Sequence, residues 1–114
     1  MKGQLSILNL SECDSNLVRS KKVLEKFGSG LCKEIKMKPY KRMIIKRFGK
    51  GNLRGYSGVQ FIETSSIVVH LDEHENKVFV DIFSCKKFDS KAAREFSKDY
   101  FKAKKVECKT IMRK

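Results

Sequence analysis

Side chains that could act as nucleophiles or transfer protons gather between residues 57 and 85. Five of them lie beside or at the ends of short apolar segments: Ser57, Ser65, Ser66, His70 and Cys85. Hydroxyls, an imidazole and a thiol are the groups that a nucleophilic or self-processing site needs, because the nucleophile must lose its proton to a neighbour. The stretch therefore predicts an active site, although each residue alone also fits an ordinary turn, strand or core position.

Short antiparallel strands are expected to carry these residues. Three apolar segments, at 56–63, 67–71 and 77–83, are separated only by the connections 64–66 and 72–76. Connections this short favour antiparallel neighbours. The pattern places Ser65 and Ser66 in the tip between the first two strands.

The remaining segments predict the elements that surround this hairpin. In chain order they are a strand at 5–10, a helix over 17–27 that the glycines at 28–30 end, strands at 31–37 and 43–48, a glycine-rich loop at 49–55, a helix that residues 88–90 cap and that reaches Phe101, and a strand at 104–112. This order predicts an α+β two-layer sandwich, an antiparallel sheet with two helices on one face. The uncovered face predicts a dimer in which two sheets pack together.

Length and composition indicate one soluble domain spanning residues 1–114. Hydrophobic residues make up 40% of the chain and charged residues 34%, which is typical of a globular protein and not of a disordered one. No apolar run approaches the roughly 20 residues that span a bilayer, and the first residues do not resemble a signal peptide. We therefore expect a cytoplasmic protein without a membrane partner.

The four cysteines and two histidines do not predict a metal site. The cysteines stand at 13, 32, 85 and 108, none of them in a C-x-x-C pair, and the histidines do not complete a zinc spacing. In a reducing compartment such cysteines remain thiols. No metal cofactor is expected.

A strongly basic balance raises the question of a polyanionic partner. The chain has 26 Lys and Arg against 13 Asp and Glu, a net charge of +13, and nine of the basic residues fall between Lys33 and Arg54 against Glu34 alone. No nucleic-acid-binding motif accompanies this charge. A solvated basic surface is the favoured interpretation, and nucleic acid is a less favoured partner.

The order of the motifs resembles the short prokaryotic S-adenosylmethionine decarboxylases. The family pattern has S-G-V, then E-S-H with a histidine five residues after the serine, then D-x-F-T-C. Ser57 opens the first motif, Ser65 falls on the processing serine, His70 on the histidine and 81–85 on the last motif, without a gap. Weaker matches lie outside this stretch, at 12–14, 47–48 and 102–106.

The resemblance implies that the chain makes its own pyruvoyl cofactor from Ser65. The Ser65 hydroxyl would attack the carbonyl carbon of Thr64, the chain would be cleaved between the two residues, and Ser57 and His70 would assist. The resulting carbonyl would form a Schiff base with the substrate amine and accept electrons from the departing carboxylate. Cys85 would return a proton to the substrate carbon.

The same resemblance implies S-adenosylmethionine as the substrate, spermidine synthesis as the process and a homodimer as the assembly. Phe48, Thr64 and Ser66 are the expected substrate-binding residues. Thr64 and Ser66 replace the Glu and His of the family pattern, and 71–74 replace T-W-P-E. Two alternatives follow: a pyruvoyl-dependent decarboxylase of arginine or ornithine, or an unprocessed, non-catalytic homologue with a regulatory or nucleic-acid-binding role.

Overall fold

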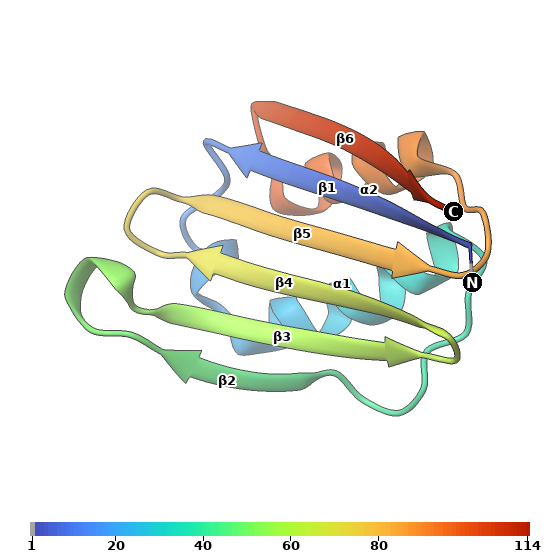
Figure 1. Ribbon diagram of the computed structural model, residues 1–114. Helices are drawn as coiled ribbons and strands as arrows, with labels where there is room; N and C mark the ends of the chain where they lie inside the picture. The colour runs from blue at the N-terminus through green and yellow to red at the C-terminus, as the bar shows by residue number, and fades with distance from the viewer. Residues whose placement is uncertain (1) are drawn as a thin grey trace.

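A six-stranded antiparallel sheet forms one layer of the molecule and two α-helices form the other (Figure 1). The computed structural model describes residues 2–114. In chain order the elements are β1 (Gly3–Ser11), η1 (Leu17–Arg19), α1 (Lys21–Glu34), β2 (Ile44–Phe48), η2 (Gly51–Leu53), β3 (Gly55–Ile62), β4 (Ser65–Asp72), β5 (Lys77–Ser84), α2 (Ser90–Phe101) and β6 (Lys105–Arg113). The strand order is β2-β3-β4-β5-β1-β6. The predicted α+β sandwich is confirmed.

Helix α1 differs from the sequence-based prediction at both ends. It begins at Lys21, where Ser20 Oγ accepts a hydrogen bond from Val23 N at 3.1 Å, and residues 17–19 form a separate 3₁₀ turn. It also continues past the glycines at 28–30, so the predicted strand at 31–37 is wrong and the sheet has six strands instead of seven.

Close packing explains why the helix contains these glycines. A Cβ on Gly28 would lie 2.6 Å from Cε of Met43, and one on Gly30 would lie 2.8 Å from the ring of Phe96. Glycine here lets these side chains lie directly against α1, at a helix-weakening cost of about 1 kcal/mol. The helix therefore continues through Gly28 and Gly30, which by sequence alone predict its end.

The two helices pack against each other through aromatic rings and bury one face of the sheet. Phe27 of α1 lies with its ring centroid 4.8 Å from that of Phe101 and 5.2 Å from that of Tyr100, both in α2. Asp89 caps α2 by accepting a hydrogen bond from Ala92 N at 3.0 Å, as its sequence position predicts. No helix in the described part of the chain is long and apolar enough to cross a membrane.

The other face of the sheet carries apolar side chains that this chain does not cover. Strand register places alternate residues of neighbouring strands on the same side. The large exposed hydrophobic residues on this open face are Ile44, Phe48, Phe61, Phe79 and Ile111, which are between 38% and 60% exposed. Several large exposed apolar side chains on one face are typical of an interaction surface.

The basic stretch predicted as two strands and a loop is distributed differently. It covers the end of α1, the connection to β2, β2 itself and the η2 loop, and all nine of its basic side chains are exposed. One of them, Arg47, forms an ion pair with Glu73 at 2.7 Å. The solvated surface expected from the sequence is therefore present.

Candidate active site

Ser65 is the first residue of β4, directly after a two-residue turn. The turn consists of Glu63 and Thr64, so the predicted tip at 64–66 is wrong: Ser65 and Ser66 belong to the strand. In the register of the sheet, Ser65 faces Ile62 of β3 on one side and Ser84 of β5 on the other. Because β4 is hydrogen-bonded to β3 on one side and to β5 on the other, the backbone around Ser65 is held in place.

The Ser65 hydroxyl donates a hydrogen bond to a buried neighbour. Its Oγ lies 2.9 Å from Oγ of Ser84, which is fully buried. Ser84 Oγ also accepts a hydrogen bond from the backbone N–H of Lys86, again at 2.9 Å. Ser84 was not among the predicted site residues, although it falls on the threonine of the D-x-F-T-C motif matched at 81–85.

Thr64 adopts a backbone conformation that is unfavourable for its type. Its φ is +62°, in the left-handed region, and its Oγ1 donates to the carbonyl oxygen of Glu63 at 2.6 Å. A β-branched residue is rarely found there, and such a conformation costs about 1–3 kcal/mol. The strain lies at the residue whose carbonyl carbon Ser65 is expected to attack.

Replacing Thr64 with glycine is expected to stabilise the uncleaved chain and slow its cleavage. Glycine adopts positive φ without steric cost, so in a Ser65→Ala background the free energy of unfolding should rise by roughly 1 kcal/mol. With Ser65 present, cleavage should slow, because less strain is released when the peptide bond breaks. Urea unfolding and a cleavage time course measure the two effects. An unchanged unfolding free energy would contradict the assignment of strain to this residue.

Cys85 follows β5 at the same end of the sheet as Ser65. It is half-buried and lines a cavity of about 410 Å³ together with Lys86, Lys87 and Arg113. The other cysteines are in different settings: Cys108 is exposed on β6, and burial raises the pKa of both buried thiols to about 11. These two buried residues are Cys13 and Cys32. Cys85 is thus the cysteine that the fold brings to the Ser65 end.

Ser57 and His70 form a pair on neighbouring strands. They are opposite each other in the β3–β4 register, and Ser57 Oγ lies 2.8 Å from Nδ1 of His70. His70 is exposed on the open face of the sheet. A small cavity of about 180 Å³ adjoins the pair and is also lined by Phe48 and Asp72. The structure thus brings the predicted histidine, its hydroxyl partner and Phe48 together.

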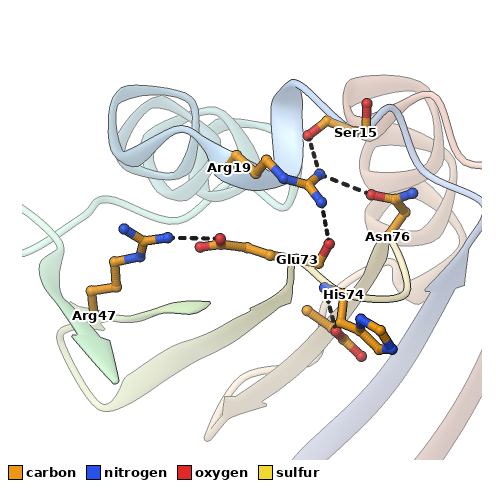
Figure 2. A network of polar contacts seen from close by, with 7 residues as sticks. Ser15, Arg19, Arg47, Glu73, His74 and Asn76 are labelled. Carbon is orange, nitrogen blue, oxygen red and sulfur yellow. Dashed lines mark hydrogen bonds and ion pairs between the residues drawn. The ribbon is translucent and has the colours of Figure 1, made fainter. Parts of the chain in front are cut away.

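A polar network fixes the turn next to this pair (Figure 2). Arg47 of β2 forms its ion pair with the carboxylate of Glu73, while the guanidinium of Arg19 donates to the backbone carbonyl of Glu73 and to Oδ1 of Asn76. The β4–β5 turn is therefore tied to η1 and to β2. Since β2 ends in Phe48, the network also holds that residue's strand beside the cavity.

The two groups of candidate residues lie at opposite ends of the sheet. Ser65 and His70 are five positions apart on β4, which corresponds to about 17 Å at the rise of an extended strand. Figure 1 shows the β3–β4 turn and the end of β5 at one end of the sheet, and the β4–β5 turn at the other. The predicted set of residues is thus divided within one chain: Ser65, Ser66 and Cys85 at one end, Ser57, His70 and Phe48 at the other.

The described residues offer no metal-binding cluster. No group of three or more His, Cys, Asp or Glu side chains among residues 2–114 is arranged to hold a metal ion. The chemistry that the Ser65 end allows within one chain is nucleophilic attack by Ser65 on the neighbouring strained peptide, with the Cys85 thiol at the same end of the sheet.

Comparison with known proteins assigns the family. The model of the S-adenosylmethionine decarboxylase family matches residues 4–114. This chain belongs to the S-adenosylmethionine decarboxylase family. The resemblance inferred from the motifs is confirmed, and the modest identities below show that this S-adenosylmethionine decarboxylase homologue is a divergent member.

Two relatives and one solved structure illustrate this similarity. The S-adenosylmethionine decarboxylase proenzymes of Clostridium botulinum strains Langeland and Hall are 36% and 34% identical over 73 residues. These matches span 63% of this chain and 63% of each relative, which is less than two thirds of their length. The crystal structure of the adenosylmethionine decarboxylase from Aquifex aeolicus VF5 superposes with a TM-score of 0.78 at 17% identity, over 96% of this chain and 88% of the other. That likeness concerns the fold.

Proposed function

We propose that this protein is a pyruvoyl-dependent decarboxylase of S-adenosylmethionine that matures by cleaving itself between Thr64 and Ser65. The observation that carries the proposal is the strained Thr64 next to a strand-fixed Ser65 with a bonded hydroxyl. Ser65 aligns with the processing serine of the family pattern. The strained residue, Thr64, therefore contributes the carbonyl of the peptide bond that this processing would break. The product would serve spermidine synthesis.

The residues present fit a pyruvoyl group at position 65. The group derives from Ser65 itself, so it needs no binding pocket of its own, only a chain end fixed by the sheet. A pyruvoyl carbonyl supplies an electron sink for decarboxylation. Cys85, half-buried at the same end of the sheet, is the proposed proton donor to the substrate carbon.

We propose that a second copy of the chain completes the site, because His70 lies about 17 Å from Ser65 along β4 and Ser57 lies opposite His70 on β3. Two sheets that pack face to face around a two-fold axis perpendicular to their strands place the Ser65 end of one copy over the His70 end of the other. We therefore propose a homodimer with two sites. Each site would bring the Ser65 end of β4 and Cys85 of one chain toward Ser57, His70 and Phe48 of the other. In the uncleaved chain the Ser65 side chain lies on the helix-covered side of the sheet, in register with buried Ser84.

The open face of the sheet supports this assembly. Its exposed apolar side chains run from Ile44 on β2 to Ile111 on β6, across the whole sheet. Sheets that pack face to face bury such side chains in a layer about 10 Å thick. A partner on this face would cover Phe48 and Phe61, which are otherwise 60% and 49% exposed.

Intact-protein mass spectrometry tests the proposed maturation directly. Freshly purified wild-type protein should give two fragments divided between residues 64 and 65, the second one starting with a pyruvoyl group. Ser65→Ala should give one uncleaved chain, because the nucleophile is absent. Wild-type protein that remains a single chain and behaves like Ser65→Ala would refute the proposal and favour the non-catalytic homologue.

Decarboxylation of arginine or ornithine is the second candidate activity. The cavity beside His70 is small, about 180 Å³, and its lining includes Phe48, Arg54 and Asp72. Its size suits a substrate more compact than S-adenosylmethionine. Release of carbon dioxide from S-adenosylmethionine, arginine and ornithine, measured side by side with the cleaved protein, separates the two candidates.

A further inference from the structure

We infer that Ser84 is a positioning residue for the self-cleavage: its hydroxyl holds the Ser65 nucleophile in the orientation that attacks Thr64. The inference rests on the proposed function, because it concerns the same cleavage. Ser84 Oγ lies 2.9 Å from Ser65 Oγ and is fully buried. It is therefore in direct contact with the atom that would form the new bond.

The Ser65 hydroxyl is the donor of this pair and Ser84 is the acceptor. A serine hydroxyl has one proton to donate and two lone pairs that accept. The backbone N–H of Lys86 can only donate, and it occupies one lone pair of Ser84 at 2.9 Å. The other lone pair accepts the Ser65 proton. The Ser65 proton thus points toward Ser84, and the lone pairs of Ser65 Oγ are not used in this hydrogen bond.

This arrangement serves the first step of the cleavage. In that step the Ser65 oxygen forms a bond to the carbonyl carbon of Thr64, the Thr64–Ser65 C–N bond breaks, and the hydroxyl proton ends on the freed nitrogen. The product is an ester isomeric with the peptide, so no further reagent is required. Ser84 holds the nucleophile against β5 while the strained turn presents the carbonyl.

The strand that carries Ser84 is itself anchored. Ser84 pairs in register with Gln4 of β1, a buried side chain that donates to the carbonyl oxygen of Phe88 at 3.1 Å and accepts from its N–H at 3.3 Å. Gln4 and Lys86 together fix the segment that follows β5. The Ser84 hydroxyl accepts from the Lys86 N–H, and the backbone that carries it pairs with β1 and β4, which gives the nucleophile a fixed partner.

Ser84→Ala and Ser84→Cys are expected to slow cleavage about tenfold or more, since each removes a good acceptor for the Ser65 proton. Cysteine keeps nearly the same volume, so it tests the role even if the alanine variant folds poorly. Ser84→Thr keeps the hydroxyl and should cleave within a few-fold of the wild-type rate. The readouts are the fraction of cleaved chain by mass against time and the fraction of ester that hydroxylamine releases.

Ser6→Ala is the matched control. Ser6 is also fully buried, lies on the neighbouring strand and bonds a hydroxyl, Oγ1 of Thr110, at 3.0 Å. It should lose similar stability yet cleave at the wild-type rate. Equal slowing in Ser6→Ala and Ser84→Ala, or wild-type cleavage in Ser84→Cys, would overturn the inference while the proposed function stands. A wild-type chain that never cleaves would overturn both.

Discussion

Coexpression of Ser65→Ala and His70→Ala chains is expected to restore about a quarter of wild-type decarboxylase activity, although each variant alone is inactive. The first variant lacks the proposed source of the pyruvoyl group, and the second lacks the imidazole that the proposed dimer contributes to the partner's site. In a mixed dimer, one site contains both substitutions, and the other contains Ser65 of one chain and His70 of the other. Random association makes about half of all dimers mixed, each with one working site.

Tagged chains make this complementation measurable. Purifying mixed dimers through two different tags should give about half of wild-type activity per dimer, with one cleaved and one uncleaved chain. In the control, His74→Ala takes the place of His70→Ala. His74 is the chain's only other histidine and lies exposed in the β4–β5 turn. His74→Ala should be active by itself. Mixed dimers without activity would show that Ser65 and His70 do not act across two chains.

Cys85→Ser is expected to separate maturation from decarboxylation. The chain should still cleave, because Ser65, Ser84 and the strained Thr64 are unchanged. The rate of carbon dioxide release should fall about 100- to 10,000-fold, the range typical of losing a general acid. A hydroxyl is a much weaker acid than a thiol at neutral pH, so serine keeps the size of the side chain and removes its proton-donating ability.

Cys108→Ser is the matched control for this variant. Cys108 is an exposed cysteine of β6, on the side of the sheet away from the open face. It should retain both cleavage and decarboxylation, measured by mass spectrometry and carbon dioxide release. Full decarboxylase activity in Cys85→Ser would exclude Cys85 as the proton donor. Loss of cleavage would instead place Cys85 in the maturation step.

Residue types and their periodicity were sufficient to predict much of the fold. Runs of apolar residues located all six strands to within a few positions. In the four central strands these residues alternate, because one face of each packs against the helices. Asp89 predicted the start of α2, since a cap is a local interaction between neighbouring residues. The spacing of a serine, a histidine and a cysteine also predicted the family, which the comparison confirmed.

Tertiary contacts decided what local signals could not. The glycines at 28 and 30 predicted the end of a helix, but close approach to Met43 and Phe96 makes them part of its packed face. The turn between β3 and β4 was predicted at 64–66 but lies at 63–64. The side chains of Ser65 and Ser66 fit a turn and a strand equally well, so they did not show where the turn ends. Placing the turn at Glu63 and Thr64 instead makes Ser57 and His70 equally distant from it, and so directly opposite each other.

The sequence by itself therefore determined the chemical groups of the site, and only the tertiary structure decided their distribution in space. Residues that follow one another along an extended strand move apart by about 3.3 Å each, so Ser65 and His70 cannot meet within one chain. Residues far apart in the sequence become neighbours through sheet register, as Ser65 and Ser84 do. That register depends on the whole sheet, which no local pattern contains.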